Sequence, residues 1–271
     1  MAKEKDHNFL NVSDKQLDYL ERKLAALLPT EDKEGRKSFA GLFDGLTLKT
    51  IFGLFHSEYL QDFEFPIATG KEADVFCATN NEGELRAIKI FRTNTTAFKN
   101  MLPYLEGDRR FMHLRKGTLN ISRIWTHKEF KNLHRLHDAG VPVPEPIHFK
   151  DNIIIMEYIG DETMAAPNLR TAAPHVSDFN KVYAELKDAL YKGYRKAKLV
   201  HADLSEYNLL YWKDKLWVID VGQAVLSNHP HANKFLRRDI KNIVRYFSKQ
   251  GVDTGTEEEI WDWLHEGLDE D

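Results

Sequence analysis

The chain has 271 residues, of which 42% are hydrophobic and 30% charged, and its formal net charge at pH 7 is -4. This composition is typical of a globular protein of one large or two small domains. It lacks the bulk basic excess of many nucleic-acid-binding proteins, but it does not exclude a local basic patch. Cys77 is the single cysteine, and no apolar run reaches the roughly 20 residues of a membrane span. The start shows no signal-peptide core, so we expect a cytoplasmic protein without membrane association.

Two amphipathic helices are predicted near the start of the chain. The first covers residues 13–28, where a capping box precedes a stripe of leucines, and the second covers about 47–59. Residues 30–38 are charged and apolar-free, so they are predicted to form a loop or linker. We therefore assign residues 1–60 to a helical extension that packs on the rest of the protein or binds a partner.

Beyond residue 61 the apolar period changes to that of strands. Three strands are predicted, at 63–69, 72–79 and 84–91. The polar stretch 92–120 has no clear period, so we expect a long loop that is mobile without ligand. Its basic side chains could close on phosphate or RNA: Lys99, Arg109 and Arg110.

The remainder of the chain is rich in predicted helices. A helix over 122–139 is stopped by Gly140, and a buried strand covers 152–160. The later elements are a helix at about 177–197, short strands at 199–200, 209–212 and 216–219, and helices at about 231–250 and 256–268. This order predicts an α+β fold with a strand-rich lobe at 61–159 and a helix-rich lobe at 160–271.

Three polar residues stand at or beside the ends of the short strands, namely Asp203, Asn208 and Asp220. The pattern His-x-Asp-x-x-x-x-Asn, followed by an Asp after a strand, is the phosphoryl-transfer arrangement of protein kinases. Asn208 and Asp220 offer the hard oxygen ligands that Mg²⁺ prefers. Asp203 is then free to accept the proton of an attacking hydroxyl group. The sequence thus predicts that a metal-bound nucleotide fills the space between the three side chains.

A lysine and a glutamate complete the predicted charged centre. Lys89 lies mid-strand in AIKIF, and an inward-facing lysine needs an anionic partner. Phosphate oxygens and a helical glutamate fill that role in kinases, and THKEFKNLHRL supplies Glu129 on the next helix. Each residue alone is compatible with a solvated surface; the order of both before the Asp–Asn–Asp triad favours a nucleotide site.

Two further segments are predicted to contact the nucleotide. The turn ATGKEADVF contains Thr69, Gly70 and Lys71, which could bring backbone N–H groups and a cation to phosphates. The strand NIIIMEYIG would supply the adenine contacts, with Met156 beside the base and Glu157 and Ile159 offering backbone groups. The turn departs from the G-x-G-x-x-G pattern of ordinary kinases.

Taken together these motifs resemble the RIO family of atypical serine/threonine protein kinases. The resemblance rests on ATGKEADVF, AIKIF, FKNMLPYLEGDRRF, WTHKEFKNL, GVPVPEP, MEYIG, LVHADLSEYNLL, IDVGQAV and RRDIKNIVRYF. The first and the IDVGQ motif are similar to the branch without an N-terminal winged-helix domain, and the short C-terminus is typical of an archaeal-type member.

This resemblance implies a trimmed two-lobed kinase fold and the cofactors ATP and Mg²⁺, with Mn²⁺ as an alternative cation. It implies Asp203 as the catalytic Asp, Asn208 and Asp220 as metal ligands, and a phosphoaspartate formed on Asp220. It also implies ATPase activity and a role in maturation of the small ribosomal subunit, bound to pre-ribosomal RNA and proteins. The ribose contact stays open, with Thr171 near the place where the family carries it.

Two other functions stay open. One is a small-molecule phosphotransferase of the aminoglycoside or choline kinase type, which uses a similar triad. The other is a non-catalytic ATP-binding assembly factor, which would bind nucleotide without turnover.

Two further side chains are assigned structural roles. We expect His201 to be packed or hydrogen-bonded rather than a catalytic acid. We expect Asp239, which neighbours the buried stripe of its helix, to accept backbone N–H groups of the loop around His201. The His-Pro-His at 229–231 lacks further ligands at zinc spacing.

Overall fold

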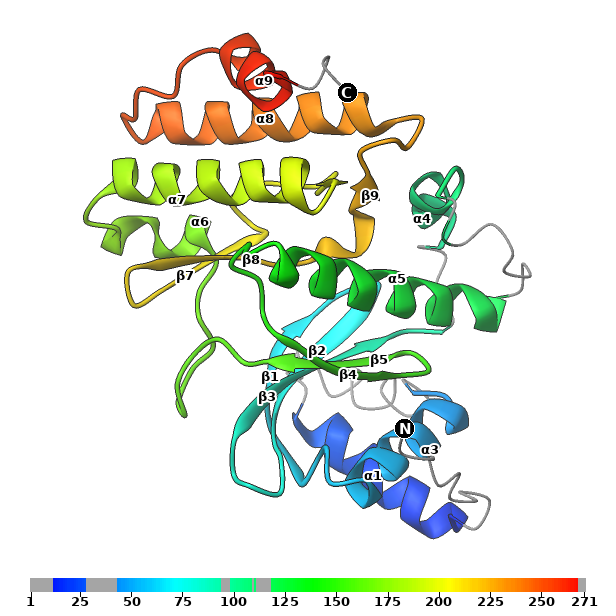
Figure 1. Ribbon diagram of the computed structural model, residues 1–271. Helices are drawn as coiled ribbons and strands as arrows, with labels where there is room; N and C mark the ends of the chain where they lie inside the picture. The colour runs from blue at the N-terminus through cyan, green and yellow to red at the C-terminus, as the bar shows by residue number, and fades with distance from the viewer. Residues whose placement is uncertain (1–11, 28–42, 94–97, 109, 111–117, 268–271) are drawn as a thin grey trace.

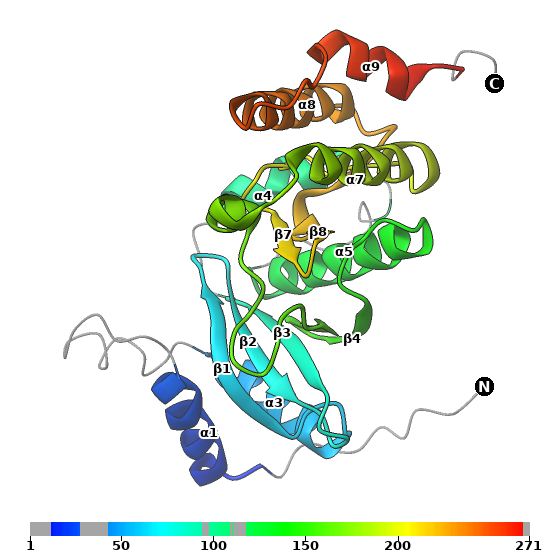
Figure 2. The ribbon, with the colours of Figure 1, turned by 90° about the vertical axis from the view of Figure 1, so that its left-hand side faces the viewer.

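The computed structural model describes residues 12–27, 43–93, 98–108, 110 and 118–267. These residues form two lobes, a sheet with helices packed against it and a mainly helical lobe (Figures 1 and 2). Helix α5 lies between the sheet and the helical lobe (Figure 1). The predicted α+β organisation is therefore present.

The N-terminal lobe is built on a five-stranded antiparallel sheet with the order β1-β2-β3-β5-β4. Its strands are β1 (Asp62–Thr69), β2 (Ala73–Thr79), β3 (Leu85–Phe91), β4 (Pro146–Lys150) and β5 (Ile153–Glu157). Strand β4 was not predicted from the sequence, because its residues follow a proline-rich run and show no clean alternation. The predicted end of β5 was three residues too late, since the chain leaves the sheet after Glu157.

Helices α1 (Asp14–Leu27) and α3 (Gly45–His56) cover the face of the sheet that points away from the helical lobe (Figure 1). Asp44 caps α3 by accepting the backbone N–H of Thr47, as the preference for Asp at this position requires. The apolar stripes of both helices share one core with the sheet: Leu20, Leu24, Leu48, Ile51, Leu54, Phe63, Phe76, Ile88, Ile90, Ile153 and Ile155.

The segment that was predicted as a loop contains a helix, α4 (Phe98–Leu105), so that part of the prediction was wrong. Pro103 inside the helix obscured its period. Tyr104 of α4 stacks on Phe235 with ring centroids 5.1 Å apart, so packing against the helical lobe stabilises this short helix. Helix α5 (Thr118–Asp138) follows, starting four residues earlier than predicted.

The helical lobe has a core formed mainly by residues of its helices. It contains α6 (Leu169–Ala172), η2 (Ala173–His175), α7 (Phe179–Tyr191), a π-helical turn η3 (Lys192–Lys196), α8 (Ala232–Lys249) and α9 (Glu257–His265). Inward-facing residues at helical spacing fill the space between them, among them Leu186, Leu236, Ile240, Ile243, Phe247 and Leu264. No helix within the described residues is long and apolar enough to cross a membrane.

Two small antiparallel ladders position the loops that carry the Asp–Asn–Asp triad. Strand β6 (Leu199–Val200) pairs with β9 (Val225–Leu226), and β7 (Leu209–Trp212) pairs with β8 (Lys215–Val218). The β6–β7 loop and the β8–β9 loop, which contains the short 3-10 helix η4 (Val221–Gln223), consequently lie side by side.

Candidate active site

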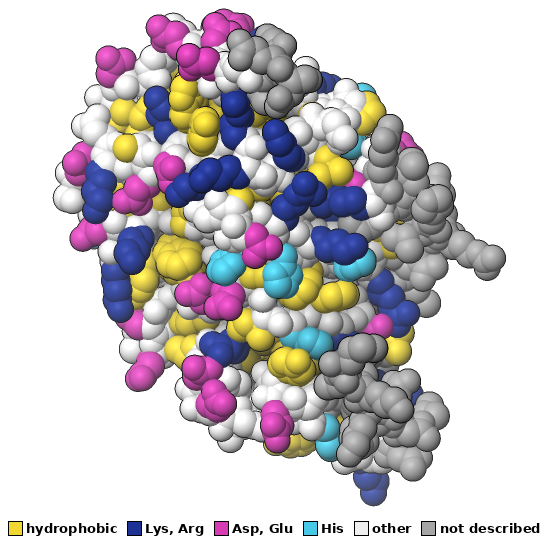
Figure 3. Space-filling view, viewed as in Figure 1, with side chains coloured by type: hydrophobic (Ala, Val, Ile, Leu, Met, Phe, Trp, Pro, Cys, Tyr) yellow, Lys and Arg dark blue, Asp and Glu magenta, His cyan; other side chains and the backbone are white. Residues whose placement is uncertain are grey.

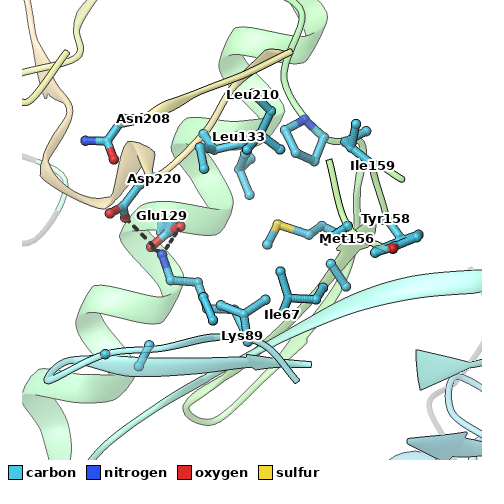
Figure 4. Close-up of a pocket in the computed structure, with 18 of the residues that line it drawn as sticks. Ile67, Lys89, Glu129, Leu133, Met156, Tyr158, Ile159, Asn208, Leu210 and Asp220 are labelled. Carbon is cyan, nitrogen blue, oxygen red and sulfur yellow. Dashed lines mark hydrogen bonds and ion pairs between the residues drawn. The ribbon is translucent and has the colours of Figure 1, made fainter. Parts of the chain in front are cut away.

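A cavity of about 390 Å³ lies between the two lobes, bounded by the sheet, α5 and the triad loops. One end has apolar walls and the other carries charged side chains (Figure 4). Most of the predicted site residues line it: Thr69, Gly70, Lys71, Lys89, Glu129, Met156, Glu157, Ile159, Asn208 and Asp220. Asp203 does not line the cavity itself, but its carboxylate accepts a hydrogen bond from Asn208, which does line the cavity.

Lys89 reaches the charged end of the cavity from the middle of β3. Ile88 and Ile90 on either side point into the core with α1 and α3, so strand alternation turns Lys89 toward α5. Its Nζ donates to both oxygens of Glu129, at 2.7 and 3.0 Å, and to Oδ1 of Asp220 at 2.9 Å. The lysine–glutamate contact predicted from the sequence is present, and Asp220 shares the same cation (Figure 4).

Burial and mutual attraction set the charges of this cluster. Burial alone would lower the pKa of Lys89, but Asp220 and Glu129 outweigh it and raise that pKa above its ordinary value. Lys89 in turn holds the pKa of Asp220 below its usual range. The Glu129 side chain is 2% exposed, whereas that of Asp220 is 50% exposed. An anion that enters the cavity can therefore reach Lys89 from the Asp220 side.

Asp220 has an unusual backbone. Its φ and ψ are 58° and 55°, a left-handed conformation that costs a residue with a side chain roughly 1–2 kcal/mol. Such a conformation persists only where surrounding contacts impose it, and it is concentrated at functional sites. Gly222 supplies one of those contacts, because a Cβ there would lie 2.7 Å from Trp125 Nε1 and 2.9 Å from Glu129 Oε2. The loop thus packs against α5 as closely as glycine permits.

The β6–β7 loop holds Asp203 and Asn208 together. Nδ2 of Asn208 donates to the main-chain oxygen of Asp203 at 2.8 Å and to its Oδ2 at 3.2 Å. Burial raises the pKa of Asp203, and the neighbouring Asp220 adds to the rise. A carboxylate with a raised pKa is better suited to accept a proton than an ordinary aspartate.

Asp239 on α8 organises this loop from inside the core. It is 0% exposed, and its two oxygens accept the backbone N–H groups of Ala202 at 2.7 Å and Leu204 at 3.0 Å. These bonds hold Ala202 at φ 67°, which is again left-handed. The predicted contact of Asp239 with the loop is confirmed.

His201 is engaged at both ring nitrogens. Nε2 donates to the main-chain oxygen of Ile219 at 3.0 Å, and Nδ1 accepts the N–H of Asp203 at 3.3 Å. Burial lowers the pKa of His201, so the imidazole ring stays neutral and keeps its proton on Nε2. The expected hydrogen-bonded histidine is confirmed.

Asn208 and Asp220 have the chemistry of a magnesium site. The amide of Asn208 uses Nδ2 toward Asp203, so Oδ1 lies on the side that faces Asp220 (Figure 4). Within the described part of the chain no cluster of three or more His, Cys, Asp or Glu could hold a metal ion by itself. Two protein oxygens nevertheless suit Mg²⁺, which keeps several waters and takes its remaining ligands from substrate phosphates. The side chains present therefore fit the ion when it enters with a nucleotide.

The apolar end of the cavity fits a flat aromatic ring. Its walls come from both lobes: Ile67, Val75, Ala87, Leu133, Met156, Leu210 and Ile219. Ile159 is buried, and its backbone N–H donates to no oxygen among the described residues. A buried, unpaired N–H is costly, so a ligand acceptor such as a purine nitrogen would satisfy it.

The turn between β1 and β2 closes the cavity above the charged end. Gly70 donates its N–H to the main-chain oxygen of Ala73 at 3.0 Å, and a Cβ at Gly70 would lie 3.1 Å from that oxygen. Lys71 and Glu72 follow along the same wall. Burial raises the pKa of Glu72, with a further contribution from Asp220.

Some residues were missed and some predictions are not met within the described residues. Glu72 was not predicted as a site residue, and neither were the α5 residues Lys128 and Asn132 that hold the Asp220 loop. Each has the sequence context of an ordinary surface side chain. Thr171 does not line the cavity. Of the basic residues expected to close on a ligand, Arg110 binds Asp108 and Asn132 instead, whereas Arg109 and the side chain of Lys99 lie outside the described residues.

Comparison with known proteins places the chain in a family. The RIO domain matches residues 74–260, which include both triad loops, Lys89 and Glu129. The chain belongs to the RIO family. Among curated RIO proteins it is 39% identical over 226 residues to a RIO-type serine/threonine-protein kinase Rio1 of Haloferax volcanii, covering 82% of this chain and 76% of that protein.

Eukaryotic RIO proteins are longer. The chain is 34% identical to the human serine/threonine-protein kinase RIO1 over 272 residues, covering 96% of this chain and 48% of that protein. It is 35% identical to the rio1 kinase of Dictyostelium discoideum over 235 residues, and these cover 86% of this chain and 41% of its relative. The chain thus spans less than half the length of these two relatives.

Solved RIO structures share the fold. A Rio2 kinase of Chaetomium thermophilum, solved as an ADP/Mg²⁺-phosphoaspartate complex, has a TM-score of 0.63 at 23% sequence identity, covering 91% of this chain and 74% of that one. The predicted two-lobed, kinase-like architecture is confirmed.

Proposed function

We propose that this RIO-family chain is a Mg²⁺-dependent serine/threonine protein kinase and ATPase that forms a phosphoaspartate on Asp220. The observation that carries the proposal is the buried contact of Lys89 with Glu129 and Asp220 at the charged end of the cavity, beside Asn208. The names of the relatives support kinase activity, and the phosphoaspartate of the Rio2 complex supports the intermediate.

The geometry suggests how the nucleotide is bound. The purine would lie between the apolar walls, with the N–H of Ile159 and the main chain at Glu157 facing its edge, beside Met156. Lys89 would exchange its contact with Asp220 for phosphate oxygens while Glu129 keeps its position. The backbone of Gly70 and the cation of Lys71 would cover the phosphates from the β1–β2 turn.

Asn208 and Asp220 would hold Mg²⁺, which when bound neutralises charge on the phosphates. In the first step a carboxylate oxygen of Asp220 attacks the γ-phosphorus. The bond between that phosphorus and the β–γ bridging oxygen breaks, and its electron pair leaves with ADP. In the second step Asp203 takes a proton from water, or from a serine or threonine hydroxyl, as that oxygen attacks the acyl phosphate and releases Asp220.

The hydrolytic outcome is favoured when no protein substrate is held in line. Positioning supplies most of the catalysis of phosphoryl transfer. The chain has the metal-loop sequence IDVGQAV and no Ala-Pro-Glu motif. We therefore propose that transfer to protein is slow or restricted, and that ATP turnover accompanies a role in small ribosomal subunit maturation. Only the family resemblance supports this last role.

Steady-state turnover of ATP with and without Mg²⁺ tests the enzymatic assignment. The wild-type protein should release ADP only with the metal, and Asp203→Asn should lower kcat by about 10²- to 10⁴-fold without loss of nucleotide binding. Nucleotide binding without any turnover in the wild-type protein would instead favour a non-catalytic binding role.

A further inference from the structure

The loop that follows β8 is held from behind by two polar side chains of α5. Nζ of Lys128 donates to the main-chain oxygens of Gly222 and Ala224, both at 2.6 Å. Nδ2 of Asn132 donates to those of Val221 at 2.8 Å and Ala224 at 3.0 Å. Both side chains are 0% exposed. Three carbonyl groups of one short loop are therefore bound by one helix.

The type of residue at each position fits this task. A lysine is almost never fully buried unless its ammonium group is paired, since removal from water is costly. The bonds from Lys128 to the loop are the compensation, together with its position 5.1 Å from the Trp125 ring. Burial lowers the pKa of Lys128 to about 7, with Arg110 nearby adding to the shift. A leucine would fill the space at lower cost, so packing alone does not explain Lys128.

The orientation of the Asn132 amide is also fixed. Its Oδ1 accepts a hydrogen bond from Nη1 of Arg110 at 2.9 Å, and Arg110 in turn donates to both carboxylate oxygens of Asp108. Since Oδ1 is committed to Arg110, Nδ2 must face the loop. Asn132 thus presents both of its N–H groups to main-chain oxygens.

The same turn of α5 also determines the position of Lys89. Lys128 and Asn132 are one helical turn apart and share a face, and Glu129 lies on the adjacent strip that faces Lys89. The loop packs so closely that a Cβ at Gly222 would meet Glu129 Oε2 at 2.9 Å. One helical turn therefore fixes the phosphate-binding lysine and the metal loop relative to each other.

We propose that Lys128 and Asn132 are positioning residues that hold Asp220 in its left-handed conformation, with its carboxylate aimed at Mg²⁺ and the γ-phosphate. This inference rests on the proposed function of Asp220 and adds a role for residues that do not touch the nucleotide. Groups that support metal ligands from behind commonly control metal affinity and activity without contacting the metal.

The test compares Asn132→Leu and Lys128→Met with Thr126→Val, using ADP-binding calorimetry with and without Mg²⁺ and steady-state ATP turnover. Thr126 is a suitable control because it is also 0% exposed on α5, and its hydroxyl bonds within the helix, to Ser122. Asn132→Leu preserves size while removing both donors, so it remains informative should Lys128→Met fail to fold.

Asn132→Leu should lower the Mg²⁺-dependent gain in ADP affinity and kcat by about 10- to 100-fold, and leave ADP binding without Mg²⁺ almost unchanged. Thr126→Val should match the wild type in kcat and in ADP affinity both with and without Mg²⁺. The inference is overturned if Asn132→Leu behaves like Thr126→Val, or if it loses ADP affinity equally with and without Mg²⁺. If the wild-type protein itself shows no Mg²⁺-dependent binding, the proposed function fails first and the inference with it.

Discussion

Replacement of Lys89 by methionine separates the contribution of the buried ion pair to stability from its contribution to catalysis. Lys89→Met leaves the Glu129 carboxylate, 2% exposed, without its cation. Removal of one partner from a buried ion pair typically costs about 3–5 kcal/mol. Asp220, whose side chain is 50% exposed, adds little because solvent screens it. We therefore expect a loss of about 3 kcal/mol in the free energy of unfolding at pH 8.

The double variant Lys89→Met/Glu129→Gln removes both charges and should regain most of this loss. The double variant leaves no uncompensated buried charge, and it is this charge that makes removal of one partner of a buried ion pair so costly. ATP turnover should be abolished in both the single and the double variant, because each lacks the phosphate-binding cation. Urea-induced unfolding followed by circular dichroism, together with ADP release in steady state, measures both quantities on the same samples.

The stability loss of the single variant should also depend on pH. Burial raises the pKa of Glu129 and Lys89 opposes the rise, so Lys89→Met raises the folded-state pKa further above that of the unfolded chain. A carboxyl group with a raised folded-state pKa loses stability as pH rises between the unfolded and folded values. The deficit relative to wild type should thus be smaller at pH 5 than at pH 8. A loss below about 1 kcal/mol at pH 8, or a double variant no more stable than the single one, would refute this reasoning.

Three further predictions concern the triad loops. Asp239→Asn should cost about 1–3 kcal/mol in unfolding free energy and lower kcat, because one buried backbone N–H loses its acceptor. The control variant Asp188→Asn, at an exposed position, should cost less than about 1 kcal/mol. Equal urea midpoints for the two variants would contradict the role of Asp239. Gly222→Ala should lower kcat with little change in the KM for ATP, because the added Cβ would lie 2.7 Å from Trp125 Nε1 and push the metal loop away from α5. An unchanged kcat would show that the loop tolerates the shift. Burial raises the pKa of Asp203 above its ordinary 3.8, and only the carboxylate form can accept a proton. We therefore expect kcat/KM to increase with pH through an acidic limb whose midpoint lies above 3.8. A pH-rate profile that is flat across that region would argue against Asp203 as the base.

Helices and strands with a clear apolar period were predictable from the sequence. Helix α8 and the strands β1 to β3 lie within a few residues of their predicted bounds, because each buries one regular face. Helix α4 was not predictable, since it contains Pro103 and is stabilised by Tyr104 packing on the distant Phe235. Strand β4 was missed for a related reason, as pairing with β5 determines it more than its own alternation does.

The candidate site divides in the same way. Lys89, Asp203, Asn208 and Asp220 stand out in the sequence because charged or amide side chains beside short strands need partners. Lys128 does not stand out, since a lysine followed by a glutamate on a charged helix is usually solvated. Its burial and its carbonyl partners depend on how α5 packs against a loop some ninety residues later in the chain. Such contacts are tertiary, and the local hydrophobic periodicity of the sequence does not predict them.

The phosphoryl group itself provides the most direct test of the central claim, that Asp220 receives it. The wild-type protein is incubated with γ-labelled ATP and Mg²⁺, and the labelled protein is treated with hydroxylamine, which cleaves acyl phosphates and leaves phosphoserine intact. The label should be hydroxylamine-labile, absent in Asp220→Asn and altered in amount in Asp203→Ala. If ATP turns over while all of the label resists hydroxylamine, phosphate passes directly to serine or water and the phosphoaspartate mechanism is wrong.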